Sequence, residues 1–165
     1  MARSIIICKS VHHQNTWKVA QAVADVLHAE VVEPEEFPAA DLDEYELVGF
    51  GSGIYYGGFH PSLLSWIRGL PDAALVHRRA FVFSTSGLPL LWRFWHRPLT
   101  TELARKGFEV SGEFHCRGFD SWGPLGIFGG INRHHPNEKD LRHAAEFARK
   151  MLATVDREQV YRAAG

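Results

Sequence analysis

Near the start of the chain, residues 10–16 form a polar run whose residue types suit the binding of an anion. The run contains two hydroxyl side chains and an asparagine amide, follows the apolar residues 4–9 and leads into the amphipathic segment 17–27. The first N–H groups of a helix lack intrahelical acceptors and carry a partial positive charge, and hydroxyl groups add further donors. A buried strand that turns into a helix through such residues predicts a phosphate site.

Two further tracts, residues 52–58 and 84–87, are rich in glycine and hydroxyl side chains and also follow apolar runs. The first tract carries the adjacent Tyr55 and Tyr56, whose rings are suited to stack on a flat ligand. The segment that begins at Gly118 is a long glycine-rich loop with aromatic residues, which is typical of a lid or binding loop.

Strand and helix patterns alternate about five times along the chain. Runs of β-branched and aromatic residues predict strands at 4–9, 30–33, from 47, 80–83 and 109–116, and apolar residues at helical spacing predict helices at 17–27, from 61, for about two turns after Pro98, and from 137 to 152. We expect Asn15 or Thr16 to cap the first helix and Asn137 with Asp140 to form a capping box on the last. The last helix has an apolar stripe of Leu141, Ala145, Ala148 and Leu152.

This alternation predicts one α/β domain over residues 1–165, a parallel sheet with helices on both faces and right-handed crossovers. Ligands of such sheets bind beyond the carboxyl ends of the strands. The polar tracts lie at those ends, whereas the opposite ends of the strands are plain, so the sequence places the candidate site at one edge of the sheet.

Three familiar phosphate-binding patterns do not fit. No Gly-Lys-Ser/Thr ending of a Walker loop is present, and the glycine spacing of residues 49–53 differs from the dinucleotide-binding fingerprint. A low-molecular-weight tyrosine phosphatase needs an arginine six residues after its cysteine, but Gln14 stands six residues after Cys8. Without that guanidinium nothing would chelate the phosphoryl group.

The chain resembles the flavodoxin family. Flavodoxins hold the FMN phosphate in a loop that ends Gly-Asn-Thr before the first helix, and this chain has Gln14-Asn15-Thr16 there. The loop length is similar to that of the menaquinone-dependent protoporphyrinogen oxidase branch, whose pattern is Ser-Thr-Arg-Asp-Gly-Gln-Thr. The resemblance implies a flavodoxin-like, doubly wound five-stranded parallel sheet in the order 2-1-3-4-5, with helices on both faces.

The resemblance also implies FMN as cofactor, with its phosphate in the first loop and its ring between the two later tracts. The candidate cofactor-binding residues are Ser10, His12, His13, Gln14, Asn15, Thr16, Ser52, Gly53, Ile54, Tyr55, Tyr56, Gly57, Ser84, Thr85, Ser86 and Gly87. Gln14 replaces the family's glycine. If the turn needs a positive φ there, glutamine costs about 1 kcal/mol.

The function implied is an FMN-dependent oxidoreductase that passes electrons between the flavin and a quinone-like or other small acceptor. No side chain is assigned as acid or base, because flavin chemistry belongs largely to the cofactor. Two alternatives stay open. One is an electron-transfer module that serves a protein redox partner, and the other is a flavodoxin fold that has lost its cofactor and acts as an interaction domain.

Charge and composition bound the partners. A net charge of −1 and a pI near 6.8 argue against nucleic acid. Two cysteines without CxxC spacing fit a reducing cytoplasm. His12-His13 and His134-His135 lack metal-ligand spacing, so no metal site is expected.

The segment from Leu88 to Leu99 combines tryptophans with arginines. It fits either a helix start that covers the core, with Pro98 interrupting it, or a contact with a membrane surface or a protein. Association between copies of the chain is left open.

Overall fold

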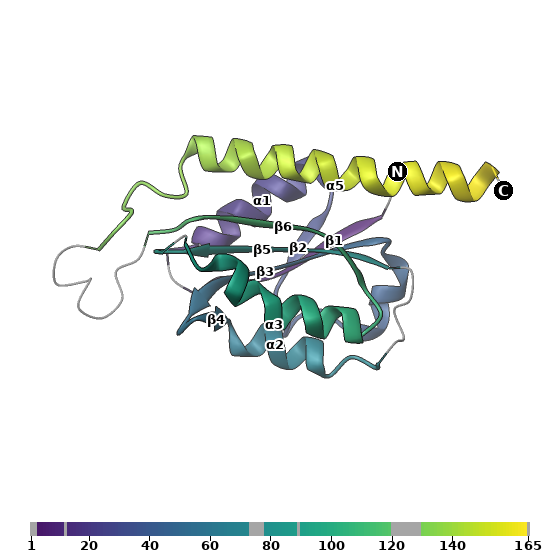
Figure 1. Ribbon diagram of the computed structural model, residues 1–165, viewed down its shortest axis with the longest axis horizontal. Helices are drawn as coiled ribbons and strands as arrows, with labels where there is room; N and C mark the ends of the chain where they lie inside the picture. The colour runs from purple at the N-terminus through teal and green to yellow at the C-terminus, as the bar shows by residue number, and fades with distance from the viewer. Residues whose placement is uncertain (1–2, 12, 73–77, 89, 120–129, 165) are drawn as a thin grey trace.

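The computed structural model describes residues 3–11, 13–72, 78–88, 90–119 and 130–164, with side chains as far as residue 157. A parallel sheet forms the centre of the protein (Figure 1). Its strands are β1 (Ser4–Lys9), β2 (Glu30–Val32), β3 (Leu47–Tyr55), β5 (Arg79–Ser86) and β6 (Glu109–Arg117), in the spatial order β2-β1-β3-β5-β6. This is the predicted order, and the doubly wound α/β fold is confirmed. One short strand was not predicted: β4 (Gly58–Phe59) pairs antiparallel with the end of β3.

Helices cover both faces of the sheet. Helices α1 (Asn15–Leu27) and α5 (Glu138–Ala164) lie on one face, and α2 (Pro61–Arg68) and α3 (Trp92–Arg105) lie on the other (Figure 1). A 3₁₀ helix, η1 (Ala39–Glu44), precedes β3. No helix in these ranges is both long enough and apolar enough to span a bilayer.

The three consecutive isoleucines of β1 serve two separate cores. Ile6 packs in the apolar cluster beneath α1 and α5, whereas Ile5 and Ile7 belong to the cluster beneath α2 and α3. All three side chains are fully buried. Alternating side chains point to opposite faces of a strand, so a strand covered on both faces needs apolar residues at every position.

Two glycines of β3 make room for aromatic rings of the neighbouring strand. A Cβ atom at Gly51 would lie 2.1 Å from the ring of Phe83, and one at Gly49 would lie 2.3 Å from the ring of Phe81. Both phenylalanines are fully buried. The glycine run that lacks the dinucleotide spacing is therefore explained by packing inside the sheet.

Of two predicted helix starts, the cap of α1 differs in the structure and that of α5 does not. Asn15 and Thr16 lie inside α1, and the residue before the helix, Gln14, makes no capping hydrogen bond with its side chain. The predicted cap is wrong because both side chains bond to distant strands and loops instead. The capping box of α5 is confirmed: Asn137 Oδ1 accepts from the Asp140 N–H at 3.1 Å, and Asp140 Oδ2 accepts from the Asn137 N–H at 2.8 Å.

The predicted interruption at Pro98 is wrong, since α3 runs through this residue. A proline removes a single N–H donor, and Pro98 lies on the exposed side of α3, where water can hydrate the carbonyl left without a partner. On the inner side His96, Leu99 and Leu103 are fully buried and hold the helix on the sheet. Of the stripe predicted for α5, Ala148 is buried and Leu141 and Leu152 pack partly buried against the core, whereas Ala145 is not among the core residues. The structure adds Ala144, Met151 and Val155 to this face.

Candidate functional site

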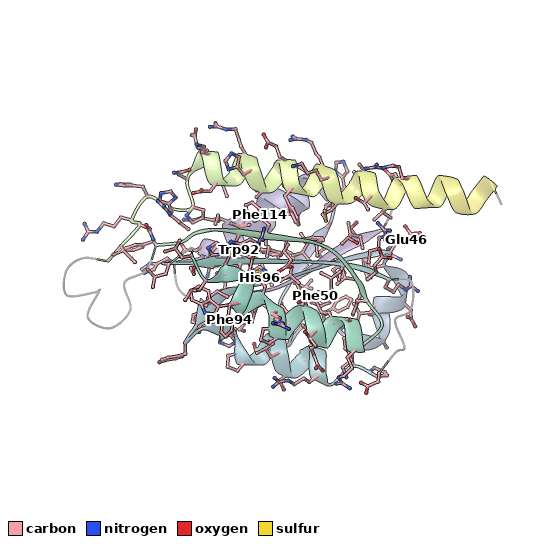
Figure 2. The ribbon with its side chains drawn as sticks, in the orientation of Figure 1. Glu46, Phe50, Trp92, Phe94, His96 and Phe114 are labelled. Atoms are coloured by element: carbon pink, nitrogen blue, oxygen red, sulfur yellow. The ribbon has the colours of Figure 1, made fainter. Side chains whose placement is uncertain are left out.

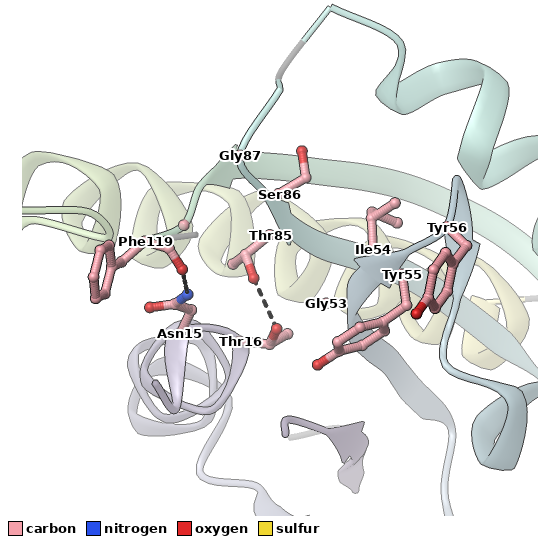
Figure 3. Close-up of a pocket in the computed structure, with 11 residues that line it drawn as sticks. Asn15, Thr16, Gly53, Ile54, Tyr55, Tyr56, Thr85, Ser86, Gly87 and Phe119 are labelled. Atoms are coloured by element: carbon pink, nitrogen blue, oxygen red, sulfur yellow. Dashed lines mark hydrogen bonds between the residues drawn. The ribbon is translucent and has the colours of Figure 1, made fainter. Parts of the chain in front are cut away.

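A cavity of about 300 Å³ opens at the carboxyl ends of the parallel strands (Figure 3). In the close-up, Asn15 and Phe119 form one side and Ile54, Tyr55 and Tyr56 form the other, with Thr16 and Thr85 between them. The described residues that line it are Asn15, Thr16, Gly53, Ile54, Tyr55, Tyr56, Thr85, Ser86, Gly87, Gly118 and Phe119. The three polar tracts of the sequence therefore meet around one space.

The turn before α1 is left-handed at two successive residues. His13 and Gln14 both have a φ of 54°, although neither is glycine. The positive φ at Gln14 meets the condition under which glutamine is expected to be less favourable than glycine at this position. It turns the chain sharply, so that the N–H groups of the first turn of α1 face the cavity end of the sheet. The first intrahelical bond is donated by the Lys18 N–H to the Gln14 carbonyl, at 3.0 Å.

Two hydrogen bonds tie the start of α1 to the opposite wall. Thr16 Oγ1 and Thr85 Oγ1 lie 2.8 Å apart, and both side chains are almost completely buried. Asn15 Nδ2 donates to the backbone carbonyl of Phe119 at 2.8 Å. Gly118 makes this approach feasible, because a Cβ atom there would lie 3.0 Å from Asn15 Nδ2. The start of α1 is thereby fixed against β5 and the end of β6.

The two tyrosines occupy different places in a tight hairpin. Tyr56 and Gly57 have φ values of 51° and 79° and join β3 to β4, which is the geometry of a type I′ turn. The Tyr55 ring folds over Gly53, and its hydroxyl accepts from the Val11 N–H at 3.2 Å. Tyr56 projects outward and is 89% exposed. Tyr55 therefore closes the cavity toward the first loop, whereas Tyr56 stands at its opening.

Not every predicted site residue reaches the cavity. Nine do: Asn15, Thr16, Gly53, Ile54, Tyr55, Tyr56, Thr85, Ser86 and Gly87. Among the described residues, the lining does not include Ser10, His13, Gln14, Ser52, Gly57 and Ser84. His12 falls outside the described part of the chain, as does most of the predicted lid, residues 120–129.

Two of the predicted serines, Ser52 and Ser84, are buried and bonded to other partners. Ser52 Oγ accepts from the His60 N–H at 3.0 Å and donates to the Gly53 carbonyl at 2.6 Å, both inside the β3–β4 hairpin. Ser84 Oγ lies 2.7 Å from His96 Nε2, on the α3 side of the sheet. The sequence tract was assigned to one ligand as a whole, but alternate residues of a strand point to opposite faces.

Two lining residues and three of the four members of a cluster around Ser84 were not in the predicted site. Gly118 and Phe119 come from the loop that the sequence places near the site without assigning its residues. The cluster joins Ser84 to His96, His115 and Glu113. The detectable signal is the spacing of Glu113 and His115, two polar residues on the same face of a strand.

Burial controls the protonation of this cluster. It lowers the pKa of His96 to about 3, with the neighbouring His115 adding to the effect. Burial likewise lowers the pKa of His115 to about 4, although a hydrogen bond to the Ser84 backbone acts to raise it. Burial raises the pKa of Glu113, and the positive charge of Arg93 partly offsets that rise. Both imidazoles are therefore neutral at neutral pH.

The cysteines carry no nucleophile. Cys8 and Cys116 are free and buried, and burial raises the pKa of each thiol. A buried thiol that stays protonated is inert, which agrees with the absence of a phosphatase arginine after Cys8.

Exposed apolar side chains gather in the segments beside the cavity. Leu88, Leu90, Leu91 and Phe94 precede or begin α3 and are 57% to 92% exposed. In the same segment His96 and Leu99 are fully buried, and Trp92, Phe94 and His96 are marked in Figure 2. The reading of this segment as a cover for the core holds only for its second half.

Comparison with known proteins gives consistent likenesses. A family model described as Flavodoxin domain matches residues 5–90. The chain is 41% identical over 150 residues to a protein of Methanocaldococcus jannaschii named Uncharacterized protein MJ0298, covering 91% of this chain and 98% of that protein.

Solved structures share the fold at low sequence identity. A flavodoxin of Streptococcus pneumonia TIGR4 superposes with a TM-score of 0.69 at 16% identity, covering 93% of this chain and 99% of the other. A flavodoxin, WrbA-like protein of Agrobacterium tumefaciens gives 0.71 at 15% identity, covering 95% and 99%. Membership of the protoporphyrinogen oxidase branch stays a prediction. The matched family model, which spans more than half of the 165 residues, establishes that the chain belongs to the flavodoxin family.

Proposed function

We propose that the protein binds FMN in the cavity at the carboxyl ends of the strands and passes electrons to a small, quinone-like acceptor. The observation that carries the proposal is the meeting of Asn15 and Thr16, at the start of α1, with Thr85 and the paired tyrosines around one cavity. Its volume lies at the lower end of the range usual for small-ligand pockets.

The lining residues fit the two ends of the cofactor. Thr16 and Thr85 are bonded to each other and so leave one hydroxyl proton to donate beside the N-terminus of α1, where a phosphate is favoured by the helix N–H groups and partial charge. Among the described lining residues no side chain is cationic, so the phosphate charge would rest on these donors. Ile54, Tyr55 and Tyr56 present apolar and aromatic surface to a flat ring.

The bound flavin would supply the redox chemistry, and the chain would orient and shield it. Tyr55 closes the cavity toward Val11, and Phe119 packs against His13 with ring centroids 4.2 Å apart. These contacts limit the entry of water from the loop side. The opening beside Tyr56 leaves one edge accessible to an acceptor.

The apolar residues next to the opening favour an apolar acceptor. Tyr56, Leu90 and Phe94 are each at least 73% exposed. Isolated exposed apolar side chains are ordinary, but a group of them next to a cavity is typical of a binding surface. A quinone-like molecule would contact this surface while its ring reaches the flavin edge. Two reduced, buried cysteines fit a cytoplasmic protein.

Titration of the purified protein with FMN, followed by flavin fluorescence, tests cofactor binding. We expect saturable binding with a one-to-one end point and at least tenfold weaker binding of riboflavin, which lacks the phosphate. Thr16→Val should weaken FMN at least tenfold, because it removes a donor at the helix start. The matched control is Thr101→Val on the exposed side of α3, which should leave FMN affinity unchanged. Equal affinities for FMN and riboflavin would contradict the phosphate assignment.

Two observations favour a second candidate, a cofactor-free interaction domain. Gln14 holds a left-handed conformation at the position where the flavodoxin loop has glycine, and the Thr16–Thr85 bond gives each hydroxyl a partner without a ligand. Gln14→Gly separates the candidates. Tighter FMN binding in this variant would support the flavin site, whereas negligible FMN affinity in both proteins would support the second candidate.

A further inference from the structure

A continuous row of side-chain hydrogen bonds leads from the surface of β6 to the edge of the cavity. Glu113 Oε2 lies 2.8 Å from His96 Nδ1, and His96 Nε2 lies 2.7 Å from Ser84 Oγ. The row continues from Ser84 Oγ to His115 Nδ1 at 3.0 Å and from His115 Nε2 to Ser86 Oγ at 3.4 Å. Ser86 is one of the residues that line the cavity.

The two ends of the row are accessible and its middle is dry. The Glu113 side chain is 36% exposed, whereas Ser84 and His96 are fully buried. Phe59 and Trp92 pack their rings edge-on against His96, with centroids 5.1 Å and 5.0 Å away. Since water is excluded from this middle part, a proton can pass it only along the side chains.

The distances from Ser84 through His96 to Glu113 also match a hydrolytic Ser-His-Glu triad. That chemistry requires a substrate carbonyl beside the serine oxygen. Ser84 has no exposed surface, is not part of the cavity lining, and shares its hydroxyl with a second imidazole. The arrangement therefore does not suit acyl transfer.

The row accepts two opposite hydrogen-bond directions without leaving a donor facing a donor. With Glu113 protonated, each group donates toward the cavity, both imidazoles carry the proton on Nε2, and Ser86 donates to the Leu88 carbonyl at 2.9 Å. With Glu113 ionised, each group donates toward Glu113 and both imidazoles carry the proton on Nδ1. A row with two such states can pass one proton and reverse as it does so.

We propose that Glu113, His96, Ser84, His115 and Ser86 form a proton relay that supplies the cavity from solvent. The inference rests on the proposed function, because the cavity must hold a redox reaction that consumes protons. Reduction of a quinone-like acceptor to its hydroquinone takes two electrons, supplied through the flavin by an external reductant, and two protons. Each proton requires one passage of the relay.

One passage balances as follows in charge and atoms. Glu113 gives its proton to His96 Nδ1, the Nε2 proton of His96 moves to Ser84, and the proton of Ser84 moves to His115 Nδ1. The Nε2 proton of His115 moves to Ser86, whose own proton goes to the acceptor. The passage leaves Glu113 ionised and both imidazoles in the Nδ1–H tautomer. Before the second proton can pass, both rings must return to the Nε2–H tautomer and Glu113 must regain a proton from solvent. The neutral imidazoles required by both states agree with their lowered pKa values.

Nitrogen-15 NMR of the histidines in the cofactor-free protein tests the coupling directly. As the pH rises through the ionisation of Glu113, which Arg93 and His96 face, both His96 and His115 should change from the Nε2–H to the Nδ1–H tautomer with one midpoint. Ser84→Ala should uncouple His115 while His96 still follows Glu113. Glu113→Gln, which keeps the shape but cannot ionise, should abolish both changes. His143, exposed on α5, is the control, and its signals should be the same in every variant. A His115 tautomer that ignores Glu113, or follows it equally in Ser84→Ala, would overturn the relay.

A second experiment measures the rate of quinone reduction by the FMN-loaded protein. We expect Glu113→Gln and Ser84→Ala to slow the reduction of a water-soluble quinone by the dithionite-reduced protein at least tenfold, with FMN affinity unchanged. An unaltered rate in both variants would mean that protons enter directly at the partly exposed His115, and the relay would be wrong. Failure of the wild-type protein to bind FMN would contradict the proposed function instead, and the NMR result would still decide whether the row is coupled.

Discussion

The two faces of β5 carry hydroxyl groups into different surroundings. On the α1 side, Thr85 bonds to Thr16 at the floor of an open cavity (Figure 3). On the α3 side, Ser84 bonds to two imidazoles in a closed cluster. These neighbours in sequence differ in what surrounds them: the Thr85 hydroxyl, paired with Thr16, borders the cavity, and the Ser84 hydroxyl is committed to an internal network.

The comparison shows how one short tract serves two chemical roles. Because successive side chains of a strand point to opposite faces, Thr85 and Ser84 cannot reach the same ligand. Ser86 returns to the α3 face at the end of the strand, where it contacts both the cluster and the cavity. The last residue of β5 is thus the place where the closed cluster and the cavity meet.

The largest effect is expected from His96→Ala, which empties the centre of the closed cluster. The variant loses two hydrogen bonds, leaves Ser84 and Glu113 without that partner, and creates a cavity. The free energy of unfolding should therefore fall by about 3 kcal/mol. Urea denaturation measures the change. His143→Ala, at an exposed position, should shift stability by less than about 0.5 kcal/mol. A similarly small shift for His96→Ala would show that the cluster contributes little to folding.

The pH dependence of stability should come from His96, on the α3 face of the sheet. The folded protein holds His96 with a pKa of about 3, below the usual 6.5, so the unfolded chain binds more protons between these values. Stability should therefore fall as the pH drops from 7 to 5, by about 2 kcal/mol from His96 alone. Thermal melts across this range provide the measurement. His96→Phe should show a shallower decline, and an unchanged slope in that variant would contradict the assignment.

A double-mutant cycle measures the coupling between Thr16 and Thr85, on the α1 side of the sheet. Thr16→Val and Thr85→Val should each cost about 1 kcal/mol, because each leaves the other hydroxyl buried without its partner. The double variant should be close to wild type in stability, since both polar groups are then replaced by isosteres, yet it should bind FMN at least tenfold more weakly. Additive costs in the double variant would mean that the hydroxyls do not act as a pair.

The smallest effect on stability is expected at the opening of the cavity. Phe94→Ser changes a side chain that is 73% exposed, so the free energy of unfolding should move by less than about 0.5 kcal/mol. Reaction of the reduced protein with an apolar quinone should nevertheless slow several-fold. Reaction with a strongly polar acceptor is the control and should not change. Equal slowing of both would argue against an apolar contact.

The sequence predicted the sheet because its strands are covered on both faces and are therefore apolar at nearly every position. It predicted Asn15, Thr16 and Thr85 at the cavity because strand ends converge at one edge. It did not predict which face each hydroxyl takes, since that depends on the exact residue where a strand ends. The cluster around His96 was not found because only Glu113 and His115 share a strand spacing, whereas Ser84 and His96 come from another strand and a helix.

The glycine run of β3 has a consequence for how sequences of this family can change. Gly51 with Phe83, and Gly49 with Phe81, each share one volume across neighbouring strands. A larger residue at either glycine requires a smaller residue at the opposite phenylalanine, so the two positions of each pair are expected to change together. Relatives that have drifted at position 51 are expected to have drifted at position 83 in the opposite direction of size. An alignment of relatives would then show these positions varying together although they lie more than thirty residues apart.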